Sequence, residues 1–165
     1  CVRLNIGMES GSQKILDILN KGTTVDNSLK QLQAVKKAGL EMMGFFLTGV
    51  PGETEEDINQ SIRFAQQARF NYVVVDTLKI YPGTPIFEKF KEHVDFSLVP
   101  YRNEFLDEGF NRQSVLYRKK FYRDFYFSVD YLFNAPIKNL VNLDHLGILV
   151  DYVWNMSKTS SLSKN

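Results

Sequence analysis

Three groups of residues along the chain have the chemistry to bind a polar small molecule. Glu9, followed by Ser10, carries a carboxylate that can accept hydrogen bonds from an ammonium group or from ribose hydroxyls. Lys21 offers a cation that can reach a ligand carboxylate. The stretch 49–53 reads Gly-Val-Pro-Gly-Glu, and two glycines without side chains let a flat group such as an adenine lie against the backbone. The candidate site therefore comprises Glu9, Ser10, Lys21, Gly49, Pro51, Gly52 and Glu53.

Each group also has an ordinary structural explanation, and the sequence alone leaves both open. Glu9 could be a solvated carboxylate at the end of a strand. Lys21 could be a surface charge at a helix C-terminus, where the helix dipole favours a cation. The glycine loop could be a tight strand-to-helix turn, with Gly49 and Gly52 at positive φ and Glu53 at the helix N-terminus. The choice depends on where the fold places these residues.

Hydrophobic patterning predicts the elements that position them. Alternating residues predict a strand at 2–6, and a nearly continuous apolar run at 42–48 predicts a strand with both faces covered. A Val-rich run predicts a third strand at 72–80. Helical spacing and capping residues mark the segments between and after these strands, at 12–22, 24–39, 54–68 and 85–91.

This alternation is typical of parallel strands joined by right-handed crossovers. The predicted fold class is α/β: half of a partial, TIM-like (β/α) barrel with parallel strands, followed by a helical C-terminal extension. In barrels and open α/β sheets, ligands bind at the C-terminal ends of the strands. The unusual residues fall at those ends: Glu9 and Ser10 after the first strand, 49–53 after the second and 82–84 after the third.

Composition narrows the classes of partner. Lys and Arg number 20 against 19 Asp and Glu, so the net charge of +1 gives no bulk field for nucleic acid or for an anionic membrane. No apolar run approaches the roughly 20 residues that span a bilayer, and no signal-peptide pattern opens the chain. We expect a cytoplasmic location. Cys1 is the single cysteine, which excludes an internal disulfide and an all-cysteine metal site in these 165 residues.

We expect three regions: the half barrel at 1–92, a helical extension at 93–155 and a disordered polar tail at 156–165. A long helical pattern at 114–133 places aromatic residues on one face and basic residues elsewhere. Aromatics interleaved with basic residues suggest single-stranded nucleic acid. A core-packing helix with a solvated basic face is the favoured interpretation, so nucleic acid is not an expected partner.

Four stretches together resemble the radical S-adenosylmethionine (SAM) enzymes in order and spacing. They lie at 7–12, 19–24, 46–54 and 81–85, and the resemblance covers roughly residues 2–92. The most similar subgroup contains cobalamin-binding domains and includes the anaerobic magnesium-protoporphyrin IX monomethyl ester cyclase. The methylthiotransferases are more distant.

The resemblance implies roles for individual residues. Glu9 matches the polar residue at the end of the fourth barrel strand, which contacts the SAM amino group or ribose. Lys21 matches the basic residue that meets the methionine carboxylate, and 49–53 matches the glycine motif beside the adenine. The stretch 81–84 follows the sixth strand. The chain departs from the pattern at 44–46, where Gly-Phe-Phe stands in a region that carries a ribose-binding acid in some members.

The resemblance also implies parts that these residues do not supply. In this family a CxxxCxxC motif holds a [4Fe-4S] cluster that reduces SAM, and a single cysteine cannot do so. We therefore expect a fragment of a longer enzyme, whose full-length form uses SAM and [4Fe-4S], with cobalamin as an open option, on a small-molecule substrate. We expect no cofactor bound to the fragment itself.

The beginning of the chain in a strand also suggests a fragment. Its expected partner is the N-terminal half of its own barrel, and the sheet edge left exposed predicts self-association. A second function class stays open: a non-catalytic binding or scaffold module with a half-barrel fold.

Overall fold

The computed structural model describes residues 1–95 and 104–134. Contacts divide the chain into two units, 1–131 and 132–165, and the fold given below is that of the first unit. The part of the expected helical extension after residue 134 and the polar tail at 156–165 lie outside the described residues. The predicted region boundary at residue 92 stays a prediction.

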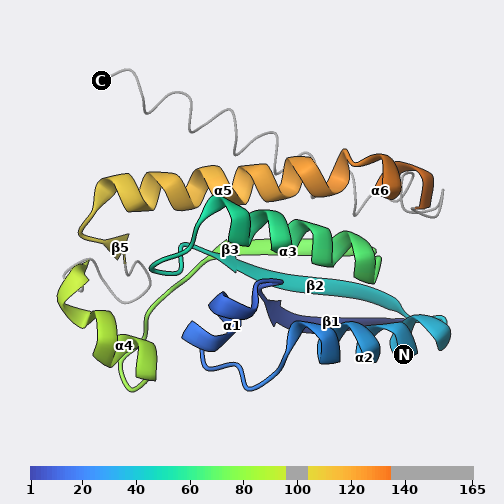
Figure 1. Ribbon diagram of the computed structural model, residues 1–165, viewed down its shortest axis with the longest axis horizontal. Helices are drawn as coiled ribbons and strands as arrows, with labels where there is room; N and C mark the ends of the chain where they lie inside the picture. The colour runs from blue at the N-terminus through green and yellow to red at the C-terminus, as the bar shows by residue number, and fades with distance from the viewer. Residues whose placement is uncertain (96–103, 135–165) are drawn as a thin grey trace. The chain divides into compact units, whose positions relative to one another are not determined.

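Three parallel strands form the centre of the fold (Figure 1). They are β1 (Arg3–Glu9), β2 (Glu41–Thr48) and β3 (Tyr72–Thr77), in the order β1-β2-β3. Helices alternate with the strands and a long helix follows them, which confirms the predicted α/β class. The sheet of the described residues is open, and β3 ends at Thr77, three residues before the predicted end.

Capping side chains start the helices that connect the strands. Thr24, Thr54 and Thr84 each accept a hydrogen bond from a backbone N–H of the first turn of α2, α3 and α4. The remaining elements of the described residues complete the order: α1 (Gln13–Ile18), α2 (Val25–Lys37), α3 (Glu55–Ala68), α4 (Pro85–Phe90), η1 (Lys91–His93), β4 (Val94–Asp95), β5 (Glu104–Phe105), α5 (Glu108–Tyr126) and α6 (Val129–Asn134).

The C-terminal helix differs from the expected one at both ends. The helical pattern predicted 114–133, whereas α5 begins at Glu108 because Asp107 caps it by accepting from the Phe110 N–H at 3.0 Å. It ends at Tyr126, and α6 begins at Val129. One long predicted helix is therefore two helices.

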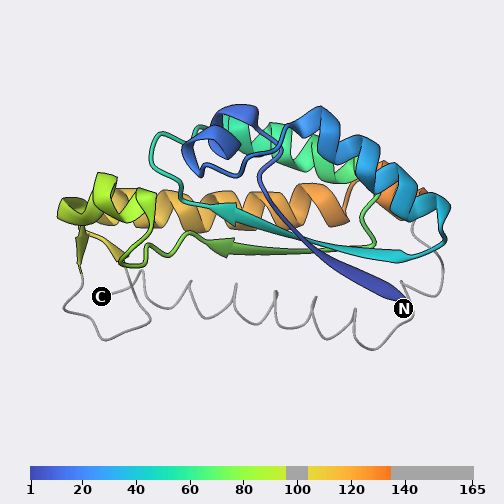
Figure 2. The ribbon, with the colours of Figure 1, turned by 90° about the horizontal axis from the view of Figure 1, so that it is seen from below.

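The connecting helices α1, α2 and α3 lie on one face of the sheet (Figure 2). Burial alternates along β2: Met42, Gly44, Phe46 and Thr48 are buried, and the residues between them are half-buried. The apolar run predicted two covered faces. In the described residues, the β2 side chains on one face are buried and those on the other are half-buried, so the second face is less covered than predicted.

Aromatic contacts join α5 to this core. Phe46 of β2 packs edge-on against Phe64 of α3 and Phe70, with ring centroids 6.4 and 5.9 Å away. The ring of Phe121 lies 4.9 Å from that of Phe46 and is fully buried. Buried aromatic pairs of this kind are worth about 0.5–1.5 kcal/mol beyond their buried area. Helix α5 is therefore part of the core rather than a separate appendage.

Tyrosine hydroxyls from α5 and α6 bind the outer backbone edge of β3 and the residue just before it. The Tyr122 hydroxyl accepts from the Val75 N–H at 2.8 Å, and the Tyr126 hydroxyl accepts from the Val73 N–H at 3.1 Å and donates to the Val73 carbonyl at 3.2 Å. The Tyr131 hydroxyl donates to the Asn71 carbonyl at 3.0 Å. An unpaired strand edge is a template for aggregation, and these hydroxyls occupy that edge. The expected self-association at the β1 edge stays a prediction.

Replacing both Tyr122 and Tyr126 by Phe removes these hydroxyls and leaves two backbone N–H groups without their present acceptors. We expect the free energy of unfolding to fall by on the order of 2–4 kcal/mol. Urea unfolding measures the change, with Tyr117→Phe, a half-buried tyrosine of the same helix, as the control. A double variant as stable as the control would show that the hydroxyls do not satisfy the β3 edge.

Candidate functional site

The end of β1 is irregular where Glu9 stands. The pairing of β1 with β2 shifts register between Gly7 and Glu9, and Glu9 has φ 64°. This left-handed conformation is uncommon for residues other than glycine and costs about 1–3 kcal/mol. The Ser10 N–H donates to the Met8 carbonyl at 2.8 Å across the turn. Backbone strain of this kind clusters at functional sites. Asn20 and Arg69 also have positive φ, but they follow helices, whereas Glu9 lies at the end of a strand.

Glu9 and Lys21 lie side by side at this end of the sheet. Lys21 Nζ is 2.9 Å from Glu9 Oε1, and the two side chains are 35% and 24% exposed. A Cβ at Gly7 would lie 3.0 Å from Glu9 Oε1 and 3.6 Å from Lys21 Nζ. The absence of a side chain at Gly7 therefore makes room for the ion pair. The structure brings together two predicted site residues that are twelve positions apart in the sequence.

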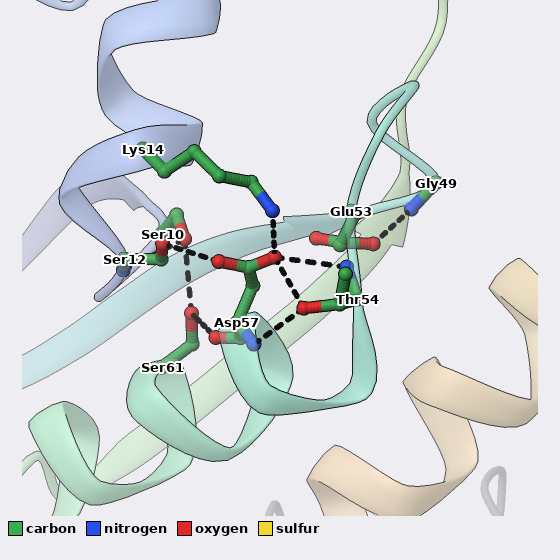
Figure 3. A network of polar contacts seen from close by, with 8 residues as sticks. All are labelled: Ser10, Ser12, Lys14, Gly49, Glu53, Thr54, Asp57 and Ser61. Atoms are coloured by element: carbon green, nitrogen blue, oxygen red, sulfur yellow. Dashed lines mark hydrogen bonds and ion pairs between the residues drawn. The ribbon is translucent and has the colours of Figure 1, made fainter.

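Ser10 points away from this pair, into the polar network shown in Figure 3. It is 1% exposed, and its hydroxyl lies 3.0 Å from that of Ser61 on α3. The Ser61 hydroxyl also accepts from the Gly11 N–H at 2.8 Å. A Cβ at Gly11 would lie 2.5 Å from Phe64 Cβ, so only glycine allows the loop to approach α3 this closely. Ser10 thus anchors the loop after β1.

Asp57, on the first turn of α3, is the centre of this network (Figure 3). Its carboxylate accepts from the Ser12 hydroxyl at 2.7 Å, from the Thr54 hydroxyl and N–H at 2.7 and 2.9 Å, and from Lys14 Nζ at 2.5 Å. Burial alone would raise the pKa of Asp57, but these hydrogen bonds outweigh burial and lower the pKa to about 2. Local sequence patterns give no signal of the contacts of Asp57 with Ser12 and Lys14.

The glycine loop after β2 is closed by its own glutamate. Gly49 and Gly52 have φ 79° and 84°, as the turn interpretation requires, and Glu53 accepts from the Gly49 N–H at 2.8 Å (Figure 3). A Cβ at Gly49 would lie 2.6 Å from the Ser114 hydroxyl of α5, whereas one at Gly52 would meet nothing within 4 Å. The loop is therefore packed at Gly49 and open at Gly52.

A cavity of about 500 Å³ lies beside the open part of this loop. It is lined by Pro51, Gly52, Phe90, His93, Leu106, Asp107 and Phe110. Its walls come from the loop, from α4 and η1, and from the start of α5. Sequence reasoning missed the contribution of α5 because no local pattern relates residues 106–114 to a loop some sixty positions earlier in the chain.

The described residues hold neither a metal cluster nor a membrane-spanning helix. No group of three or more His, Cys, Asp or Glu side chains in 1–95 and 104–134 could bind a metal ion. Within the same ranges, every helix is too short or too polar to cross a bilayer.

Residues 1–65 match the model of the Radical SAM superfamily. The matched stretch runs from β1 to α3 and contains the Glu9–Lys21 pair, the glycine loop and the Asp57 network. The sequence resemblance to this superfamily is therefore supported over that stretch.

Relatives show what the chain is similar to. A protein of Pyrococcus horikoshii named as an uncharacterized methyltransferase is 35% identical over 88 residues, which are 53% of this chain and 19% of the relative. The bacteriochlorophyllide d C-12(1)-methyltransferase of Chlorobaculum tepidum is 33% identical over 98 residues, 57% of this chain and 21% of the relative. The tRNA-2-methylthio-N(6)-dimethylallyladenosine synthase of Ruegeria pomeroyi is 31% identical over 88 residues, which are 52% of this chain and 20% of the relative.

The chain spans about a fifth of the length of these curated relatives. None of the three names is that of a cyclase, so the finer resemblance to the cyclase subgroup stays a prediction. The comparisons therefore support a Radical SAM superfamily match over residues 1–65, with relatives named as methyltransferases and as a tRNA methylthio-modifying synthase.

Burial raises the pKa of Glu53 from 4.5 to about 7, and the negative charge of Asp57 adds to this rise while the Gly49 N–H opposes it. At a pH between these two pKa values, Glu53 has lost its proton in the unfolded chain and keeps it in the folded chain. Stability should therefore fall as the pH rises from 4.5 to 7, by on the order of 2–3 kcal/mol.

Glu53→Gln tests whether Glu53 causes this pH dependence of stability, because the amide keeps an oxygen for the Gly49 N–H and cannot ionise. We expect the variant to lose most of the decline in unfolding free energy between pH 4.5 and 7. Chemical unfolding at several pH values measures it, with the exposed Glu55→Gln as the control. If the unfolding free energy of the Glu53 variant declined as much as that of the wild type, Glu53 would not be the group responsible.

Proposed function

We propose that this chain is part of a radical SAM enzyme and that the ends of its three strands form half of the SAM site. The observation that carries the proposal is the Glu9–Lys21 ion pair at 2.9 Å. The pair lies next to Gly7 at the end of β1, and Glu9 itself has a strained backbone conformation. The match of residues 1–65 to the superfamily supports it.

The pair suits the amino acid part of SAM. In the free protein the carboxylate of Glu9 and the ammonium of Lys21 neutralise each other. An amino acid ligand carries the same two charges, so its ammonium group can move to Glu9 and its carboxylate to Lys21 while both side chains stay paired. Both side chains are partly exposed, so the exchange requires little rearrangement.

The glycine loop suits the flat part of SAM. In the described part of the chain, nothing packs where a side chain of Gly52 would lie, so the backbone next to Pro51 is accessible. The residues that line the cavity beside this loop are mostly apolar. An adenine ring binds to surfaces of this kind through stacking and backbone hydrogen bonds. Glu53 acts within the loop, by holding the Gly49 N–H, rather than on the ligand.

The iron-sulfur cluster would be held elsewhere in the full-length protein, because this chain has one cysteine. When bound, the cluster would supply the electron for reductive cleavage of SAM. The names of two relatives favour methyl transfer as the reaction class, and one of these names states a small-molecule substrate. Cyclase-like chemistry and the use of cobalamin are finer alternatives within the same proposal.

The alternative is a non-catalytic binding or scaffold module with a half-barrel fold. Anaerobic expression of the full-length protein, reconstitution with iron and sulfide and measurement of 5'-deoxyadenosine separate the two. Cleavage of SAM supports the enzyme. A protein that forms no cluster and cleaves no SAM is a scaffold module.

Glu9→Gln and Lys21→Met in the full-length protein test the site. Each removes one charge of the pair, so we expect the Kd for S-adenosylhomocysteine to rise about tenfold or more, the usual size of a lost charge-assisted contact. Cleavage of SAM should weaken in parallel. Lys30→Met, an exposed lysine on α2, serves as the control. Unchanged affinity in both site variants would contradict these two SAM contacts.

A further inference from the structure

Two loops that the proposed function assigns to SAM are joined through one buried side chain. The loop after β1 carries Glu9, and the loop after β2 carries the two glycines. We propose that Asp57 is a positioning residue that fixes the two loops relative to each other and thereby sets the affinity for the ligand. This inference rests on the proposed function and adds a residue that lies outside the candidate binding surface.

The first half of the connection runs to the loop after β1. One carboxylate oxygen of Asp57, Oδ1, accepts from the Ser12 hydroxyl at 2.7 Å. One turn further along α3, the Ser61 hydroxyl accepts from the Gly11 N–H and contacts the Ser10 hydroxyl. Three consecutive residues after Glu9 are thus attached to a single helix.

The second half runs to the loop after β2. The other oxygen of Asp57, Oδ2, accepts from both the N–H and the hydroxyl of Thr54, the residue that ends this loop. Lys14 of α1 donates to the same oxygen. One carboxylate therefore binds α1 and both loops, while its own side chain is only 6% exposed.

The ionised carboxylate of Asp57 matches the donors on its two sides. The Ser12 side offers one donor, and the Thr54 and Lys14 side offers three. An asparagine has one acceptor oxygen and one donor NH2 group. If the amide turns its NH2 group toward Thr54 and Lys14, it meets three donors. If it turns the NH2 group toward Ser12, whose hydroxyl can also accept, the remaining hydrogen bonds lose the negative charge that strengthens them. Asp57→Asn thus keeps the shape of the side chain and weakens its attachment to the loops.

The loosened loop would act on the Glu9–Lys21 pair. The left-handed conformation of Glu9 is unfavourable in itself and persists only where its surroundings hold it. The attachments of Ser10, Gly11 and Ser12 to α3 are those surroundings on the C-terminal side. Relaxation of Glu9 toward an ordinary conformation would turn its carboxylate away from Lys21.

The test uses the full-length protein and S-adenosylhomocysteine as the probe, with Kd measured by calorimetry. We expect Asp57→Asn to weaken binding roughly tenfold, since small misplacements of binding groups cost one to two orders of magnitude. Glu56→Gln is the matched control: it removes the same charge from the residue just before Asp57 in the same helix turn, where the side chain is 60% exposed. The control should bind like the wild type.

A double-mutant cycle separates positioning from general destabilisation. If Asp57 acts through the pair, then Asp57→Asn should weaken binding much less in a Lys21→Met background than in the wild type. A merely structural effect would be the same in both backgrounds. Ser12→Ala, which removes a single hydrogen bond, replaces Asp57→Asn in the cycle if the latter does not fold, with an expected weakening of about threefold.

The outcomes distinguish the two levels of the proposal. A wild-type protein that does not bind the probe overturns the proposed SAM site and this inference with it. A wild-type protein that binds, together with an Asp57→Asn variant of equal affinity or with additive effects in the cycle, overturns only the positioning role.

Discussion

The buried carboxylate of Asp57 is the interaction on which the arrangement of the strand ends depends. A sheet fixes its strands along their length, but the loops beyond the ladder are free unless side chains hold them. Here one acidic side chain is satisfied by donors from α1 and from two loops, and its depressed pKa shows how strongly the folded state favours its charge. A buried charge without those donors would be costly. The loops and the carboxylate therefore require each other.

The second constraint is the outer edge of the sheet at β3. A half barrel built from parallel strands has two edges, and α5 and α6 cover the β3 side with tyrosine hydroxyls rather than with another strand. The same α5 places Ser114 against Gly49 and lines the cavity beside Gly52. The helix that covers the sheet edge is thus also the helix that shapes the surroundings of the glycine loop, which couples the stability of the sheet to the form of the site.

Local patterns were enough to predict the strands, the capped helices and the position of Glu9 and the glycine loop at one end of the sheet. Their spacing along the chain determines these features. What sequence reasoning missed depends on contacts between distant segments: the anchoring of Ser10 to Ser61, the packing of Ser114 at Gly49 and the tyrosines at the β3 edge. The helix at 114–133 was predicted too long because its aromatic periodicity continues past the end of α5, while the early start at Glu108 depends on a single cap.

The proposed site requires that the ends of β1 and β2 act together as one ligand surface. Hydrogen–deuterium exchange of the full-length protein, with and without S-adenosylhomocysteine, tests it most directly, because amide protection reports on each segment separately. We expect the ligand to slow exchange in peptides that cover residues 7–12 and 49–57 together, and to leave α2 unchanged. Protection confined to other parts of the protein, with both of these segments unaffected, would contradict it.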